Sequence, residues 1–279
     1  MNGKRDCSVG LVRSGGPECR NTPALDAGRL IVNADDWGRD RRTTELILEC
    51  ALRGAVSSVS AMVFMEDSDR AAGIARERGI DAALHLNFTT AFSAPGVPTR
   101  LREHLERLMR HLRRGRLAQV IYHPGLAGSF AYIVAAQRDE FFRIYGEEPK
   151  RVDGHHHMHL CSNVLLGRLL PAGTIVRRNF SFQPGEKGAA NRIYRQAVDR
   201  MLARRHRLTD FFFSLPPLVP RSRLEKIFSL ARKFTVEVET HPVRGEEYEF
   251  LAGGEIFRCA AGVPVAPRYL VAGARSAVK

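Results

Sequence analysis

Short apolar runs alternate with amphipathic stretches along the chain from residue 29 onward. Residues 30–34 read Leu-Ile-Val-Asn-Ala, and residues 55–63 and 82–88 are two further runs of strand-like composition. Between them, apolar residues recur at helical spacing. Buried parallel strands appear as short apolar runs, and each pair needs a crossover long enough to hold a helix. The alternation therefore predicts a parallel sheet whose strands are connected by helices.

Later parts of the chain repeat the same rhythm. We expect strands at residues 151–159, 173–178, 210–215 and 234–240, and helices at residues 43–54, 71–78, 101–114, 130–145, 189–206 and 223–232. No linker-like stretch interrupts residues 29–279, a length that suits one α/β barrel. We predict an α/β fold consisting of a single (β/α) barrel of seven or eight strands over residues 29–279. A doubly wound open sheet is the competing architecture, and residues 1–28 are predicted to be a flexible extension.

Four of the ten histidines fall within residues 151–159, Arg-Val-Asp-Gly-His-His-His-Met-His. If this segment is extended throughout, Asp153, His155, His157 and His159 share one face and His156 points the other way. Neutral imidazole is the commonest protein metal ligand, and a nearby carboxylate can fix its tautomer. The pattern favours a metal centre over a solvated or adventitiously metal-binding histidine tract.

Reactive side chains also follow other predicted strands. Asp35 and Asp36 end the first strand, His85 lies in the third, and His241 follows the last. In an α/β barrel, the carboxyl ends of the strands converge on one mouth, where such enzymes place their chemistry. A single histidine or aspartate pair is more often a cap or a turn residue. Four such groups at four equivalent strand ends predict a site at that mouth.

The amino-acid composition constrains the possible binding partners and the cellular compartment of the protein. The formal charge of +13 and a pI near 10.1 fit an anionic partner and also fit plain solubility. Five scattered cysteines without a Cys-x-x-Cys motif predict neither a disulfide framework nor a zinc ribbon. The sequence contains no apolar run of membrane-spanning length. We expect a cytoplasmic protein with at most peripheral membrane contact.

Three motifs carry a family resemblance when taken together. They are Asn33-Ala34-Asp35-Asp36-Trp37-Gly38, then Leu84-His85-Leu86-Asn87-Phe88-Thr89, then Asp153-Gly154-His155-His156-His157-Met158-His159. In this order and approximate spacing they resemble the YdjC family, which includes chitooligosaccharide deacetylases. Arg177-Arg178 and Thr240-His241-Pro242 extend the resemblance, which covers residues 29–242. It implies a barrel related to polysaccharide deacetylases and the metal-dependent removal of the acetyl group from an N-acetylated sugar.

The resemblance also implies roles for individual residues. Asp36, His85 and His155 would bind the metal, with His157 and His159 left open as alternatives to His155. Asp35 would be the general base and His241 the general acid. Asn87, Asp153, His157 and Arg177 would contact the substrate. Trp37 stands where the family more often has Phe or Leu, and residues 101–125 are unusually basic.

The chemistry implied by the resemblance suits these residue types. One divalent ion lowers the pKa of a bound water and polarises an amide carbonyl, and departure of the amine then needs a proton. Two imidazoles and one carboxylate suit zinc first, with magnesium, manganese or cobalt as alternatives.

The identity of the partners is less constrained. We expect an N-acetylated sugar that is free, nucleotide-linked or lipid-linked, because the arginines of residues 101–114 and 189–206 match a phosphate-bearing carrier. Arginines facing only water are the alternative, and a homodimer is compatible with the sequence. A metal-dependent phosphoesterase is the competing function, although no aromatic-rich basic module predicts nucleic-acid binding.

Overall fold

The computed structural model describes residues 28–182 and 186–271, so the predicted extension lies outside the described residues except for residue 28. Seven strands form one parallel sheet in the order β5-β4-β3-β2-β1-β7-β6. In chain order they are β1 (Arg29–Trp37), β2 (Ser58–Ala61), β3 (Ala82–Leu86), β4 (Arg151–Gly154), β5 (Ile175–Val176), β6 (Phe211–Ser214) and β7 (Thr235–Thr240).

Hydrogen bonds also connect the two edges of this sheet. The backbone N–H of Val176 donates to the carbonyl of Arg207 at 3.0 Å, just before β6 begins. The N–H of Ser181, just after β5, donates to the carbonyl of Phe212 within β6 at 2.7 Å. The sheet therefore curls so that β5 and β6 approach each other, which confirms the predicted (β/α) barrel with seven strands in the described part of the chain.

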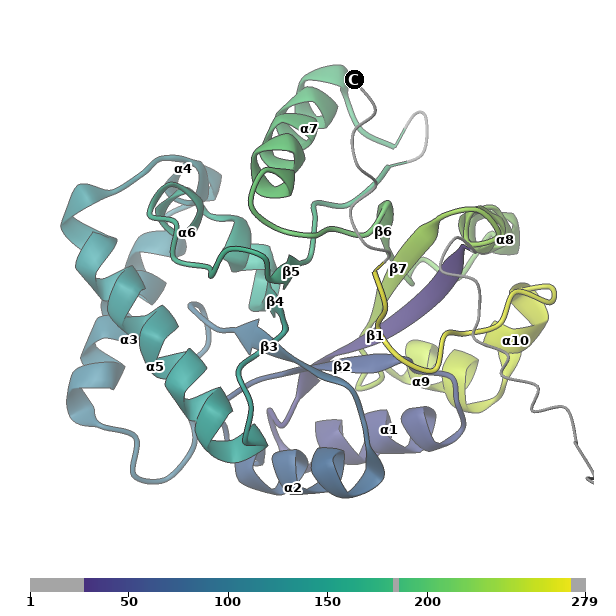
Figure 1. Cartoon of the computed structure of the whole chain (residues 1–279), viewed down its shortest axis with the longest axis horizontal. Coiled ribbons are helices and arrows are strands. Elements are labelled where there is room, and N and C mark those ends of the chain that lie inside the picture. Colours follow the sequence, from purple (N-terminus) through teal and green to yellow (C-terminus); the bar gives the residue numbers. More distant parts are fainter. Residues whose placement is uncertain (1–27, 183–185, 272–279) are drawn as a thin grey trace, which may run out of the picture.

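Helices surround the strands on the outside (Figure 1). They are α1 (Arg41–Leu52), α2 (Ser68–Arg78), α3 (Thr99–Leu112), α4 (Arg116–Val120), α5 (Ala127–Tyr145), α6 (Ser162–Leu166), α7 (Ala189–Ala203), α8 (Arg221–Leu230), α9 (Gly245–Ala252) and α10 (Glu255–Cys259), with 3₁₀ turns η1 (Pro124–Leu126) and η2 (His155–Leu160). The short helices α4, α6, α9 and α10 were not predicted. Each has eight residues or fewer, too few for a clear helical period in the sequence.

The two faces of the sheet differ in chemistry. On β1, Leu30, Val32 and Ala34 belong to the main apolar core beneath the helices. The alternate residues Asn33 and Asp35 are also buried, but their side chains hydrogen-bond to groups of other strands. Because side chains alternate along a strand, the apolar set faces the helices and the polar set faces the barrel interior. The interior is therefore a buried polar network that leads to the carboxyl ends of the strands.

The segment after α10 closes the opposite end of the barrel. Leu30 and Val265 form a parallel bridge, and the N–H of Ala266 donates to the carbonyl of Leu30 at 2.8 Å. Ala266 and Tyr269 form a small apolar cluster with Ile31 and Ile175. This C-terminal segment therefore covers the amino-terminal ends of the strands.

Within the described residues, no helix is both long and apolar enough to cross a membrane.

Candidate metal centre

Asp36, His85 and His155 meet at the carboxyl edge of the sheet. All three are buried, and one potential ligand atom from each lies within 4.8 Å of the others. Asp36 lies near the end of β1, His85 lies in β3, and His155 directly follows β4. The strands deliver the three side chains from segments far apart in the sequence, as the predicted barrel mouth requires. These residues could hold a metal ion.

Asp36 reaches this position through an irregular backbone. The pairing between β1 and β2 shifts register between Ala34 and Trp37, and Asp36 has a φ of 69°. In a regular strand, Asp36 would point away from the face used by Asp35. A positive φ is uncommon for a non-glycine residue, and such conformations are enriched at functional sites. The local distortion allows two consecutive aspartates to face the same mouth.

The histidine-rich segment is not the continuous strand that was predicted. β4 ends at Gly154, and residues 155–160 form the turn η2, in which His156 and His157 have φ values of 53° and 58°. The predicted alternation of faces over residues 153–159 is therefore wrong. His155 still joins Asp36, with 2.9 Å between its Nδ1 and Asp36 Oδ1. His159 turns back and its Nε2 lies 2.9 Å from the carbonyl of Arg177, so it is the least suited of the three alternatives to bind an ion.

Unused donor atoms at the triad fit a cation. Asp153 Oδ1 lies 2.7 Å from His85 Nδ1, so a proton on Nδ1 leaves the Nε2 lone pair directed at the triad. His85 Nε2 and Asp36 Oδ1 are buried, lie 3.4 Å apart, and lack an aligned hydrogen-bond partner. Buried polar atoms are nearly always paired. Two imidazoles and one carboxylate form the kind of ligand set that catalytic zinc sites use.

The charges around the triad also favour a cation. Burial alone would lower the pKa of His85, but the carboxylates of Asp35, Asp153 and Asp36 raise it to about 10. Burial likewise opposes ionisation of Asp36, yet the nearby imidazoles of His155 and His85 hold its pKa below the usual range. The surrounding carboxylates thus favour a positive charge at this position, even when that charge is only the protonated imidazole ring of His85.

Arg177 is the charge centre of the barrel interior. Its guanidinium binds Asp35 in a two-pronged pair, Nη1 to Oδ2 at 2.7 Å and Nη2 to Oδ1 at 2.8 Å. Nη2 lies 3.0 Å from Asp153 Oδ2, and Nε donates to Glu237 Oε1 at 2.7 Å. Burial works against charge on every member, but Arg177 holds the pKa values of Asp35 and Asp153 below normal.

The ion pairs of Arg177 affect whether a second metal ion could bind in the barrel interior. Asp35, His85 and Asp153 also lie close enough to share a metal. However, the Arg177 guanidinium already binds both aspartates, so a cation is present at that place. The geometry gives no support to a two-metal phosphoesterase, which generally recruits additional free carboxylates.

Glu237 and Glu239 are interior residues that the sequence interpretation missed. Both lie on β7, and burial raises the pKa of each, with the charge of Asp35 adding to the rise at Glu239. Glu239 Oε2 lies 3.5 Å from Arg177 Nη1 and 3.5 Å from His157 Nε2. Two acidic residues at alternate positions of an apolar strand were the available signal, because such residues share one face.

His241 lies beside the metal centre in the order of the sheet. β7 pairs with β1 so that Thr240 is opposite Ala34, which places His241 level with Asp35 at the same edge. The backbone N–H of His241 donates to Glu247 Oε2 at 2.7 Å, which anchors the residue at the strand end. Its ring atom Nδ1 is buried and has no hydrogen-bond partner among the described residues.

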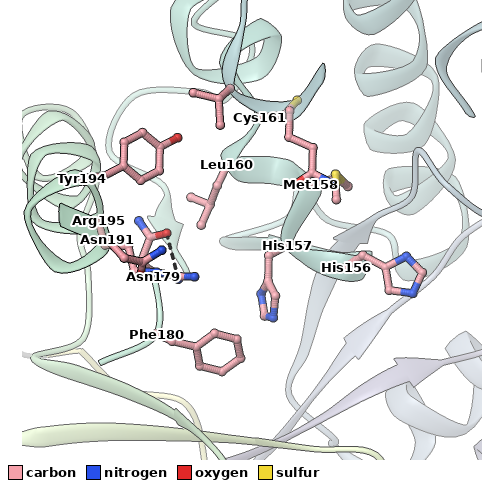
Figure 2. A pocket seen from close by; sticks show the side chains of 12 residues that line it. His156, His157, Met158, Leu160, Cys161, Asn179, Phe180, Asn191, Tyr194 and Arg195 are labelled. Carbon is pink, nitrogen blue, oxygen red and sulfur yellow. Dashed lines mark hydrogen bonds between the residues drawn. The ribbon is translucent and has the colours of Figure 1, made fainter. Parts of the chain in front are cut away.

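A pocket of about 220 Å³ is lined by His156 and His157, which directly follow His155 in the chain (Figure 2). The turn η2 contributes His156 and His157, and α7 contributes Tyr194 and Arg195 from the opposite wall. His157 points toward Phe180, and the two rings are 4.6 Å apart in an edge-to-face arrangement. The pocket therefore offers aromatic, imidazole and guanidinium groups beside the triad.

Of the four predicted substrate contacts, the structure buries three and places one at the pocket. Asn87 is fully buried, and its side chain bonds to backbone groups of Thr89 and Thr90, so it shapes a loop. Asp153 and Arg177 are each 1% exposed and lie beneath the metal centre. Their burial leaves them no surface to offer a substrate. His157 does line the pocket.

Known proteins resemble this chain in sequence and in fold. Over 135 residues, or 47% of the chain, it is 32% identical to a chitooligosaccharide deacetylase of Serratia marcescens, of which the match covers 50%. A carbohydrate deacetylase of Mus musculus is 29% identical over 63% of the chain and 56% of that protein. The chain thus spans about half the length of these relatives.

A solved structure supports the fold alone. It is described as a "putative cellobiose-phosphate cleavage protein" of Enterococcus faecalis V583, with a TM-score of 0.60 and 17% identity over 86% of this chain and 96% of that one. The family model described as YdjC-like protein matches residues 29–249, which include the triad, Asp35, Arg177 and His241. The chain therefore belongs to the YdjC family.

Proposed function

We propose that this protein is a metal-dependent carbohydrate deacetylase that hydrolyses the acetamide of an N-acetylated sugar. The observation that carries the proposal is the buried triad of Asp36, His85 and His155, which precedes the pocket-lining His156 and His157 in the chain. The names of the relatives, chitooligosaccharide deacetylase and carbohydrate deacetylase, support the reaction class.

The triad would hold one divalent ion, with zinc as the first candidate. When bound, such an ion supplies Lewis acidity, which lowers the pKa of water and polarises a carbonyl. The protein contributes the orientation of the ligands. Asp153 fixes the ring of His85, and the register shift in β1 directs Asp36 toward the same point.

Asp35 is the proposed general base. Arg177 lowers the pKa of Asp35, so its carboxylate is ionised and held rigidly beside the triad, with Oδ2 4.0 Å from His85 Nε2. In the reaction, a new bond forms between the water oxygen and the acetyl carbon, and the water proton passes to Asp35. Positioned bases of this kind contribute roughly 10²- to 10⁴-fold to a rate.

His241 is the proposed general acid. The C–N bond of the acetamide breaks only if the departing amine receives a proton, since an amide anion is a very poor leaving group. His241 lies at the same sheet edge as Asp35 and has an unpaired Nδ1. The products are acetate and the free amino sugar, so the proton balance closes between Asp35 and His241.

Two measurements test the proposal together. Purified protein should contain about one equivalent of a divalent metal, and removing it with a chelator should abolish acetate release from a panel of N-acetyl sugars. Restoring zinc should restore acetate release. Full metal content without acetate release from any sugar of the panel would contradict the assigned reaction, whereas activity that survives complete metal removal would contradict the role of the triad.

A further inference from the structure

Large apolar side chains are exposed around the mouth of the pocket. The exposed fractions are Leu117 72%, Val120 47%, Ile121 59%, Tyr122 37%, Ile193 66% and Tyr194 43%. We call these six residues the apolar rim. Exposed apolar side chains are common singly, but six of them on two segments that line one pocket indicate an interaction surface.

The rim comes from two elements that meet at the pocket. Val120 of α4 and Tyr194 of α7 both line the pocket, on opposite walls. The other rim residues flank these two in the chain. Figure 1 shows α4 and α7 projecting on the side of the molecule away from α1 and α2. The helix α7 buries only Val198, Asp199 and Leu202, so most of its surface is free.

The two chain segments that carry the rim contain charges of one sign. Residues 113–123 and 187–197 contain six Lys or Arg residues and no Asp or Glu. Arg113, Arg114 and Arg192 are exposed. Arg195 is half-buried at the pocket, where it donates to Asn191 Oδ1 at 2.8 Å. Apolar side chains flanked by cationic ones are complementary to a partner with a negatively charged surface layer and an apolar interior beneath it.

We propose that the apolar rim docks on an anionic phospholipid bilayer. Apolar side chains would enter the boundary between headgroups and acyl chains, while the surrounding arginines would contact the headgroup phosphates. A second copy of this chain fits less well. In a two-fold contact the same patch meets itself, so the basic residues of both copies would face each other.

Docking in this way would place the pocket at the membrane surface. The lining of the pocket includes Val120 and Tyr194, which are rim residues themselves. A substrate with a lipid portion could then present its sugar to the triad without leaving the bilayer. The docking proposal goes beyond the proposed reaction and does not depend on it, because binding to vesicles is measured without turnover.

Vesicle flotation of the full chain tests the proposal. We expect binding to vesicles of 30% phosphatidylglycerol in phosphatidylcholine, little binding to pure phosphatidylcholine, and weaker binding as salt shortens the Debye length from about 10 Å at 0.1 M to about 3 Å at 1 M. Leu117→Ser with Ile193→Ser should reduce binding about tenfold or more, since each serine removes a large apolar side chain whose transfer out of water favours binding. Neither residue is among those lining the pocket.

A matched control is Leu52→Ser with Val219→Ser. These residues are 61% and 75% exposed and lie outside the rim, at the end of α1 and before α8. The control should bind as the wild type does, and melting curves verify that both variants fold. Equal loss of binding in the two variants, or no binding of wild type to anionic vesicles, would overturn the proposal. So would a wild-type dimer that only the rim variant disrupts, because it would identify a second copy as the occupant.

Discussion

Tyr269 and Glu237 join the C-terminal segment to the interior of the barrel. The hydroxyl of Tyr269 donates to Glu237 Oε2 at 2.5 Å, and Glu237 Oε1 accepts from Arg177 Nε at 2.7 Å. Arg177 in turn holds Asp35 and Asp153. Tyr269 lies beyond residue 249, where the family match ends. A residue outside the matched region therefore supports the residues that orient the metal centre.

Removing this hydroxyl should weaken both the fold and the metal centre. Tyr269→Phe keeps the ring over Arg151, 4.0 Å from the guanidinium carbon, but leaves a buried Glu237 oxygen without its donor. We expect a loss of about 1–3 kcal/mol in the free energy of unfolding. Zinc affinity, measured by calorimetric titration, should fall severalfold. That is less than the roughly 10- to 100-fold typical of losing a direct partner of a ligand.

Asp81→Asn is the matched control for Tyr269→Phe. Asp81 Oδ2 accepts from the backbone N–H of Tyr269 at 3.0 Å, so this change loosens the same segment without touching Glu237. It should lower the melting temperature and leave zinc affinity unchanged. If Tyr269→Phe binds zinc as tightly as Asp81→Asn does, Tyr269 stabilises the fold but does not support the metal-binding residues.

The two adjacent aspartates should separate metal binding from chemistry. Asp36→Asn should weaken metal binding strongly, because the amide lacks the charge of the carboxylate. Asp35→Asn should retain the metal and lose roughly 10²- to 10⁴-fold in acetate release. Metal analysis after dialysis and initial rates at saturating metal measure the two effects. Equal metal loss in both variants would contradict the separate roles.

Asp35→Asn also removes one anionic partner of Arg177, so stability needs its own control. Glu237→Gln removes another partner of the same guanidinium, on the side away from the triad. Both variants should unfold more easily than wild type, whereas the large loss in rate should appear only in Asp35→Asn. If Glu237→Gln lost a similar amount of rate, the loss in Asp35→Asn would reflect the changed charge of the barrel interior and not the removal of a general base.

Arg195 should determine whether a phosphate-bearing carrier is recognised. It lines the pocket, whereas Arg107 is exposed on α3 and does not. If the substrate is nucleotide-linked, Arg195→Gln should raise KM for that sugar about tenfold or more, with little effect on a neutral N-acetyl oligosaccharide. Arg107→Gln should change neither value.

Salt provides a second measurement for the same question. Raising salt should increase KM for the charged sugar alone, because screening weakens contacts with phosphate. The proposal would be contradicted if a neutral oligosaccharide were turned over faster than the charged sugar and its KM had the same salt dependence. The arginines would then be ordinary solvent-exposed residues.

His159 should make the fold less stable in acid. Burial lowers the pKa of His159 to about 4, from the ordinary 6.5. Between these values the unfolded chain binds a proton that the folded protein excludes, so stability is complete above about pH 6.5 and declines as pH falls toward 4. The difference of pKa corresponds to about 3 kcal/mol.

His159→Gln provides the comparison for this acid sensitivity. Glutamine can still donate to the carbonyl of Arg177, which His159 Nε2 approaches to 2.9 Å, but it does not titrate. Denaturant unfolding from pH 4 to 7 should show a shallower pH dependence in the variant than in wild type. Parallel curves would mean that other groups cause the acid sensitivity.

The sequence alone determined the barrel and the reactive side chains expected at its mouth. Apolar runs that alternate with helical periods specify parallel strands. Each such strand is buried on both of its faces, whereas each connecting helix buries only one face. Residues at strand ends must then meet at one mouth. This reasoning predicted that Asp35, Asp36, His85, His241 and the histidine-rich segment lie together, since it needs only the order of the elements, and the family resemblance then implied Asp36, His85 and His155 as the metal ligands.

Only the tertiary structure decided how those residues reach their places and what lies beneath them. The positive φ of Asp36 and the turn beginning at His155 depend on packing against neighbouring strands, which local sequence does not encode. The burial of Asn87, and the contact of Tyr269 with Glu237 at a sequence separation of 32, are likewise invisible in a linear pattern. Long-range contacts of this kind form because closing the barrel brings distant side chains into a shared interior, where each buried charge must find a partner.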